Sequence, residues 1–108
     1  MVTSPNYPCN YPNNLNQAET IIAKEGMVVD LELTVFKTES EHDKLEIQDN
    51  DGTILLPARG GYDLPPPIRT RTNVVHLRFV TDRYSTRTGW SATWTSAKST
   101  GENLQEFS

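Results

Sequence analysis

The stretch Met27–Phe36, MVVDLELTVF, decides the fold class of this chain. Its side chains alternate in polarity, with one face formed by Val29, Leu31, Leu33 and Val35, and the other by Asp30, Glu32, Thr34 and Phe36. A period of two is typical of a half-buried strand, whereas a helix would scatter these apolar residues around its axis. We therefore expect a strand here, with Val35 on its inner face and Phe36 on its outer face.

Further short strands are predicted on both sides of this one. Alternation and flanking turn residues indicate strands at 18–23, 45–48, 53–56, 73–80 and 89–95. The turn Asp49–Gly52 separates two of them, and the proline-rich start, residues 1–17, is expected to be an extended edge or a loop. Residues 59–67 are predicted to be a loop, and residues 97–108 have no period. This pattern predicts an all-β, antiparallel, two-sheet sandwich.

Composition narrows the class of protein. The chain has 108 residues, which fits one domain, and it contains no apolar run long enough to cross a membrane. No signal peptide is visible at the start. The net charge of −4 argues against a nucleic-acid partner. One cysteine excludes both an internal disulfide framework and a multi-cysteine zinc site.

The charge is unevenly distributed along the sequence. Residues 1–58 hold three lysines and ten acids, for a net charge of −7, whereas residues 59–87 hold six arginines and two acids, for a net charge of +4. One interpretation is that a strand-rich fold pairs the two halves and neutralises both. The other is that some of the acids form a local cluster that binds a cation.

Three segments resemble the CUB domain family. These are Ser4–Pro8 followed by Tyr11-Pro12, then Phe36–Glu39 followed by Asp43–Asp49, and finally Phe79–Asp82 followed by Gly89–Trp94. The resemblance implies a jelly-roll-like sandwich over residues 1–96, with 97–108 as a tail or linker. It also implies a non-catalytic, secreted or extracellular module that recognises other proteins. Such modules are usually parts of larger proteins, such as secreted proteases or receptors.

The resemblance further implies a site for one calcium ion. Matched by position, the ligands are Glu39, Asp43 and Asp82, with a backbone carbonyl supplied near Tyr84 or Ser85. The connection between Glu39 and Asp43 is shorter than the family's, so Glu41 is a rival ligand. Calcium prefers several oxygen ligands from converging loops, and acids so close together repel one another unless a cation lies between them. The alternative is that these are solvated acids paired with Lys37 or Arg83.

A calcium-fixed carboxylate would offer an oxygen to a Lys or Arg of a protein partner or of a neighbouring domain. The side chains expected to flank this surface are those of His42, Tyr84 and Ser85. The family usually has four cysteines in two disulfides, of which the first would lie upstream of this start. The second, third and fourth positions fall at Gln17, near Glu41 and near Gly60, and none is cysteine, so neither disulfide is expected. Cys9 lies elsewhere, so it is a buried small side chain, a free thiol or half of an intermolecular disulfide.

Other interpretations of single motifs remain open at this stage. A glycan or polyanion could bind the arginine-rich half, through Arg69, Arg71, Arg78, Arg83 and Arg87, unless these residues pair with the acidic half. A third possibility is a structural module that folds against a neighbouring domain. We interpret Asp49–Gly52 as a hairpin turn because it lacks the later glutamate of an EF-hand. We expect neither zinc at His42 and His76 nor a catalytic triad of Ser85, His76 and Asp82.

Overall fold

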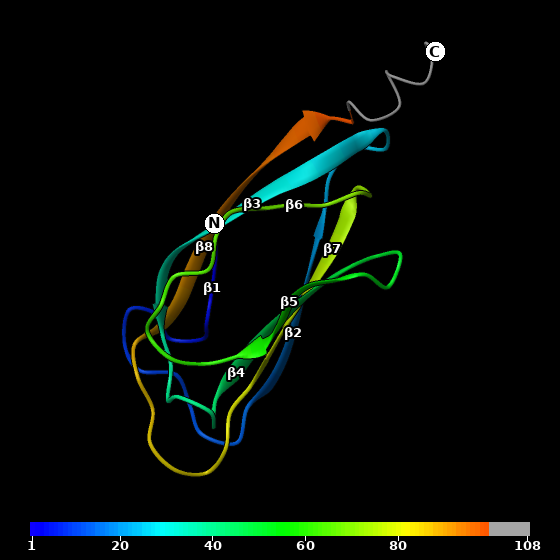
Figure 1. Cartoon of the computed structure of the whole chain (residues 1–108). Coiled ribbons are helices and arrows are strands. Elements are labelled where there is room, and N and C mark those ends of the chain that lie inside the picture. The colour runs from blue at the N-terminus through cyan, green and yellow to red at the C-terminus, as the bar shows by residue number, and fades with distance from the viewer. Residues whose placement is uncertain (100–108) are drawn as a thin grey trace.

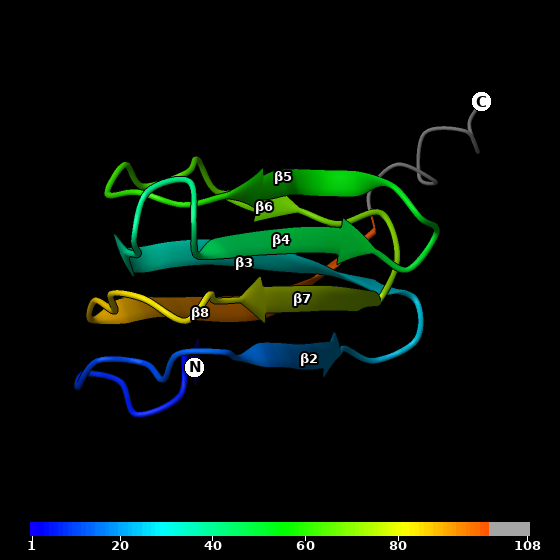
Figure 2. The ribbon, with the colours of Figure 1, turned by 90° about the horizontal axis from the view of Figure 1, so that it is seen from below.

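The computed structural model describes residues 1–99 as eight strands in two layers (Figure 1). One sheet has the order β1-β8-β3-β6 and the other β2-β7-β4-β5, and all neighbours within a sheet are antiparallel. The strands are β1 (Val2–Thr3), β2 (Asn16–Ile22), β3 (Met27–Lys37), β4 (Lys44–Asp49), β5 (Ile54–Arg59), β6 (Ile68–Arg69), β7 (Val74–Val80) and β8 (Gly89–Lys98). Figure 2 shows the two sheets stacked face to face. The prediction of an antiparallel two-sheet sandwich is confirmed.

The described residues form no helix long and apolar enough to cross a membrane.

The burial of side chains follows their alternation along the strands. The inner faces of the two sheets enclose one core, with fully buried side chains that include Leu31, Leu45, Ile47, Val75, Leu77, Phe79 and Trp90. The predicted inner face of β7, formed by Val75, Leu77 and Phe79, is confirmed.

The far end of β3 departs from the alternation predicted for it. Its pairing with β8 shifts register between Leu33 and Val35, so Thr34 is an extra residue opposite the β8 ladder. An inserted residue of this kind bends a strand and reverses the faces that its later side chains occupy. Phe36 therefore enters the core and Val35 is only half-buried, which makes the prediction for these two residues wrong.

The proline-rich start, predicted to be an extended edge or a loop, begins with the short edge strand β1, which pairs with β8. Val2 and Thr3 pair with Ala92 and Ser91, and the Ser4 amide then donates to the Trp90 carbonyl at 2.9 Å. The chain continues as a loop that buries Tyr11 completely against Phe79, edge-on at 4.9 Å between ring centroids. Edge-to-face aromatic pairs contribute about 0.5–1.5 kcal/mol beyond the area that they bury. Tyr11 therefore anchors the N-terminal segment.

Strand ends differ from prediction because backbone pairing with a neighbour, more than local composition, determines where a strand stops. β2 begins two residues before the predicted Ala18, and β8 runs to Lys98 rather than Thr95 because it pairs with β3 as far as Met27. Residues 97 and 98, assigned to a tail by sequence, thus belong to a strand. The rest of that predicted tail lies outside the described residues from position 100 onward.

The two ends of the sandwich are built differently. At one end Asp49 is buried, and its carboxylate accepts hydrogen bonds from the Arg71 amide, the Thr72 hydroxyl and the Asn50 amide at 2.6–2.8 Å. The Gly52 amide donates to the Asp49 carbonyl at 3.0 Å, which confirms the predicted hairpin turn. At the other end the loops after β3 and β7 meet (Figure 1). That end carries Asp43 and Asp82.

Candidate metal centre

A tight turn follows β3 and carries the first two acids. The amides of His42 and Asp43 both donate to the Glu39 carbonyl, at 3.2 and 3.0 Å. Thr38 holds this turn in place. Its hydroxyl donates to the Asp43 carbonyl at 3.0 Å and accepts from the Gly61 amide at 3.0 Å. The short connection noted in the sequence is therefore one closed turn that presents Glu39 and Asp43 toward the same side.

The loop after β7 brings a third acid to this turn. Ligand oxygens of Glu39, Asp43 and Asp82 lie within 4.8 Å of one another. Asp43 is fully buried, whereas Glu39 and Asp82 are half-buried. The three residues predicted to be metal ligands, which include a pair 39 residues apart in sequence, thus form one cluster, here called the acidic cluster.

Asp43 is the centre of the hydrogen bonds in the acidic cluster. Its Oδ1 accepts from the Asp82 amide at 2.9 Å, and its Oδ2 accepts from the Tyr11 hydroxyl at 2.5 Å. The same Tyr11 oxygen accepts from the Glu39 amide at 3.0 Å. Burial, reinforced by the hydrogen bond to Asp43, raises the pKa of Tyr11, so the phenol stays a donor at neutral pH. Tyr11 therefore couples both acidic loops to the core.

This role of Tyr11 was not predicted from the sequence. Its partners lie 28 and 32 residues away in the chain, and no local spacing connects a proline-flanked tyrosine with a distant acidic turn. Only the position of Tyr11 in the opening segment that resembles the family could have suggested it.

Tyr11→Phe is expected to lower the free energy of unfolding by about 1–3 kcal/mol, the usual cost of leaving buried hydrogen-bonding groups without a partner. The ring would still pack against Phe79, but the Glu39 amide and Asp43 Oδ2 would both lose their shared partner. Urea denaturation of the two proteins would measure this loss. Tyr7→Phe is the matched control, because Tyr7 is only half-buried, and an equal loss in both variants would contradict the role of Tyr11.

The acidic cluster has a deficit of positive charge around it. The Nδ1 atom of His42 lies 3.5 Å from Asp82 Oδ2, and no ion pair within the described residues joins the acidic cluster to Lys37 or Arg83. Arg83 instead lies over the ring of Tyr84, at 5.2 Å. The alternative of simple pairing with those two cations is therefore not what the structure contains. Glu39 Oε1 is also buried with no hydrogen-bond partner among the described residues.

This donor set fits a hard cation. Carboxylate oxygens from two loops, one of them unpartnered, are the ligands that calcium prefers, and a divalent ion would offset the repulsion among three close carboxylates. Glu41, the rival ligand, is exposed, has a positive φ of 68° and lies outside the acidic cluster. The ligand set that the geometry offers is thus Glu39, Asp43 and Asp82.

The residues predicted to flank this site do lie beside it. The Tyr84 amide donates to Asp82 Oδ1 at 3.0 Å, and its ring is 61% exposed. Ser85 follows in the same loop and is exposed, as is His42 in the turn on the other side. His42 and Tyr84 thus each contact Asp82, and Ser85 is the next residue in the same loop.

Other motifs singled out by sequence do not join this site. His76 lies on β7, where its Nδ1 pairs with the Thr20 hydroxyl at 3.2 Å and its Nε2 with Asn50 Oδ1 at 2.9 Å. It is therefore engaged away from Asp82 and Ser85. Cys9 is exposed and free in the N-terminal loop, so the disulfide to another chain stays a prediction.

The six arginines of the basic half do not all lie on one surface, because some belong to different sheets. Arg69 on β6 pairs with Asp30 through two hydrogen bonds of 2.6 and 2.8 Å, and Arg78 on β7 belongs to the other sheet. Arg69 lowers the pKa of Asp30 by this hydrogen bonding. Pairing of the acidic half with the basic half thus holds for Asp30 and Arg69.

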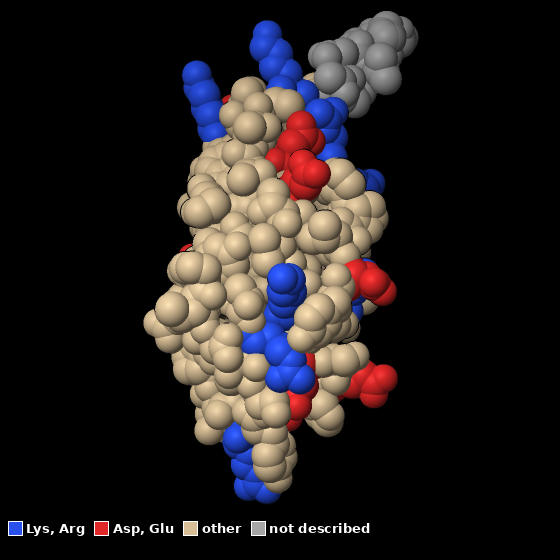
Figure 3. Space-filling model, turned by 90° about the vertical axis from the view of Figure 1, so that its left-hand side faces the viewer, with Lys and Arg blue, Asp and Glu red and all other residues tan. Residues whose placement is uncertain are grey.

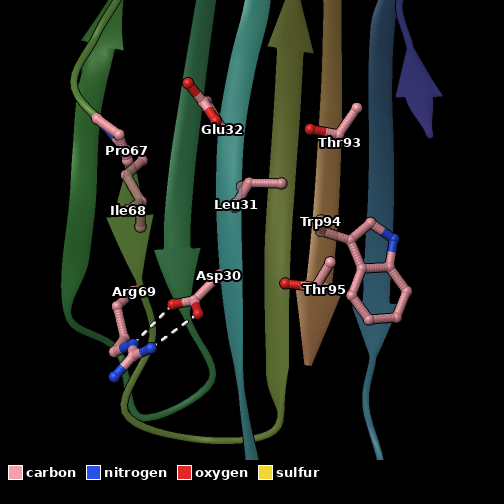
Figure 4. A pocket seen from close by; sticks show the side chains of 9 residues that line it. All are labelled: Asp30, Leu31, Glu32, Pro67, Ile68, Arg69, Thr93, Trp94 and Thr95. Atoms are coloured by element: carbon pink, nitrogen blue, oxygen red, sulfur yellow. Dashed lines mark hydrogen bonds and ion pairs between the residues drawn. The ribbon is translucent and has the colours of Figure 1, made fainter. Parts of the chain in front are cut away.

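A separate groove lies beside this ion pair (Figure 4). It has a volume of about 280 Å³ and runs over β3 and β8 next to β6, with a lining that includes Glu32, Pro67, Thr93 and Thr95. The groove is far along the strands from the turn that carries Asp43. It contains no cluster of metal-ligating side chains among the described residues, so we take the acidic cluster as the candidate site.

Comparison with known protein families agrees with the geometry. A model of the CUB domain matches residues 1–94. Human cubilin is 37% identical over 110 residues, a match that covers 94% of this chain and 3% of the cubilin chain. The chain therefore spans a small part of the length of this relative.

Solved structures give the same result. The CUB1-EGF-CUB2 region of human MASP-1/3 superposes with a TM-score of 0.82 at 27% identity, over 89% of this chain and 38% of that one. The MASP-1 CUB2 domain bound to Ca²⁺ superposes with a TM-score of 0.71 at 27% identity, over 86% of this chain and 88% of that one. One of these similar structures thus contains calcium.

Proposed function

Because this chain belongs to the CUB domain family, we propose that it is an extracellular recognition module that binds another protein through a surface organised by one calcium ion. The observation that carries the proposal is the acidic cluster, three carboxylates within 4.8 Å of one another with an unpartnered oxygen on Glu39. The MASP-1 CUB2 domain bound to Ca²⁺ supports the choice of ion. An extracellular location is supported by the likeness to that domain and to cubilin.

Glu39, Asp43 and Asp82 would hold the ion, and Tyr11 would position two of them. The ion supplies a positive charge that allows three carboxylates to stay together. With the two loops fixed in this way, less conformational entropy is lost when a partner binds. The partner is a protein, or a neighbouring domain of the same protein, that presents a Lys or Arg to a carboxylate oxygen at the rim formed by His42, Tyr84 and Ser85. Such a module does no chemistry and would serve a larger protein, such as a protease or receptor.

Asp82→Ala is expected to weaken calcium binding by at least about tenfold, a loss equivalent to about 1.4 kcal/mol. Asp82 supplies a carboxylate to the acidic cluster, but its backbone amide, which anchors Asp43, remains in the variant. Titration calorimetry with calcium alone would measure the change, so no partner needs to be known.

Glu41→Gln is the matched control for this experiment. It removes the same charge from the same end of the molecule, but at a position outside the acidic cluster. We expect its calcium affinity to stay within about twofold of the parent, as for a surface charge change of a few tenths of a kcal/mol. Equal losses in the two variants would mean that general charge, not a built site, binds calcium. No binding heat in the parent chain would contradict the calcium proposal outright.

A further inference from the structure

The loop 60–67 holds two large side chains out in solvent. Tyr62 is 58% exposed and Leu64 is 56% exposed. The loop that carries them is pinned to the body, because the Thr38 amide donates to the Gly61 carbonyl at 3.0 Å and the Arg59 guanidinium donates to the Asp63 carbonyl at 3.1 Å. These side chains are therefore presented by a fixed loop, although burial of an apolar side chain is favourable by about 1.5–3 kcal/mol.

A hollow of about 310 Å³ lies between this loop and the outer face of β3. Its lining comprises Thr34, Val35, Phe36, Lys37, Tyr62 and Leu64. The bulge in β3 turns Val35 outward, so the floor of the hollow has an apolar part. The hollow thus offers an apolar and aromatic surface with one cation, Lys37, at its rim.

A second cation is fixed beside Tyr62. The Arg87 guanidinium donates through Nε to the Tyr62 hydroxyl and through Nη1 to the Thr86 carbonyl, both at 2.9 Å. Its remaining N–H groups form no ion pair, and neither does Lys37, within residues 1–99. Asp63, the acid that follows Tyr62 in the sequence, is exposed and forms no ion pair with either cation among the described residues. Figure 3 shows one face of the molecule, on which basic and acidic side chains are scattered over a surface that is mostly uncharged.

We propose that the Tyr62 surface, defined as Lys37, Tyr62, Leu64 and Arg87, binds a sulfated glycan. A guanidinium held by two hydrogen bonds keeps its outer N–H groups oriented toward an oxyanion, and an ammonium nearby adds a second positive charge. The exposed tyrosine ring supplies a flat amphipathic face against which a sugar ring packs. The positive charge and the flat aromatic face of the Tyr62 surface together match a sugar ring that bears an anionic group.

A second pair of the same kind extends this surface toward the acidic cluster. In the same loop as Arg87, the Arg83 guanidinium lies 5.2 Å from the centre of the Tyr84 ring and donates to the Tyr84 hydroxyl at 3.1 Å. Two arginine–tyrosine pairs joined by one short loop favour a ligand in which rings and anionic groups repeat. A sulfated glycan has this repeat. The proposal does not depend on calcium at the acidic cluster.

The test uses a heparin-derived oligosaccharide as the probe, with binding measured by surface plasmon resonance in calcium buffer and again in EGTA buffer. Arg87→Gln and Lys37→Gln are each expected to weaken binding by about three- to fivefold, the upper range for single exposed ion pairs. Arg78→Gln is the matched control, because it removes the same charge from an exposed position on the other sheet. Its affinity should change by less than about twofold, as for a surface charge outside the site.

Two further probes decide the class of ligand. The desulfated oligosaccharide should bind far more weakly than the sulfated one, and polyglutamate of similar charge should not compete with it. Competition by polyglutamate would overturn the glycan assignment in favour of an acidic peptide. Equal losses in the Arg87, Lys37 and Arg78 variants would overturn the site itself. Thermal unfolding of each variant, unchanged from the parent, would show that the losses do not come from misfolding.

Discussion

Asp43→Ala is expected to abolish calcium binding and to lower the free energy of unfolding even without calcium. The substitution leaves the buried Tyr11 hydroxyl and the half-buried Asp82 amide without their acceptor. Each unsatisfied donor costs about 1–3 kcal/mol. Removing one of three close carboxylates also relieves repulsion, so we expect a net loss of about 2–4 kcal/mol in EGTA.

The calcium-dependent part of the stability separates the site from the scaffold. A ligand at one hundred times its dissociation constant raises the free energy of unfolding by about 2.7 kcal/mol. Urea denaturation in EGTA and in calcium should show this increment in the parent chain and none in Asp43→Ala. Asp63→Ala, which removes an exposed acid outside the acidic cluster, should retain it. An undiminished increment in Asp43→Ala would contradict the assignment of Asp43 as a ligand.

Gly60→Ala is expected to destabilise the turn that carries Glu39 and Asp43. A Cβ at Gly60 would lie 2.3 Å from the Asp43 carbonyl oxygen, 2.9 Å from the Thr38 hydroxyl and 3.0 Å from the Glu39 carbonyl oxygen. Two of these atoms are backbone atoms of the turn that carries the acids, so they move only if the turn opens. Overpacking of this kind costs typically about 1–3 kcal/mol, and we expect the upper end of that range.

Thermal and urea denaturation would measure the effect of Gly60→Ala. Gly52→Ala is the control, because a Cβ there meets nothing within 4 Å and only the positive φ of 95° opposes it. We expect that backbone strain to cost about 1 kcal/mol. Calcium affinity should fall in Gly60→Ala but not in Gly52→Ala. Two variants of equal stability and equal calcium affinity would show that the turn tolerates the contact.

The strands could be predicted from sequence where buried and exposed side chains alternate without interruption. Val75, Leu77 and Phe79 alternate without interruption and are all buried. β3 followed the same rule only as far as Leu33, because the bulge at Thr34 arises from pairing with β8, a partner more than fifty residues away. Bulges depend on the register between two strands, and a single sequence does not contain that register.

Some residues of the candidate site could likewise be predicted from the sequence, and others could not. The acids at positions 39, 43 and 82 were identified through a family resemblance, and the structure does bring them together. The roles of Tyr11, Thr38 and Gly60 were not identified, because each depends on a contact between segments distant in the chain. Glu41 shares the turn with two of the acids, yet its left-handed backbone turns it away from them.

The direction of β8 has a consequence for any longer protein of which this chain is a part. β8 ends at Lys98, at the end of the sandwich opposite the loops that carry Asp43 and Asp82 (Figure 1). A domain joined closely after β8 would therefore abut the Asp49 end and leave the acidic cluster uncovered. A row of such modules would have a direction, with the acidic cluster of each unit at the end away from the unit that follows. Spacing between recognition surfaces along the row would then be set by the length of the sandwich rather than by its loops.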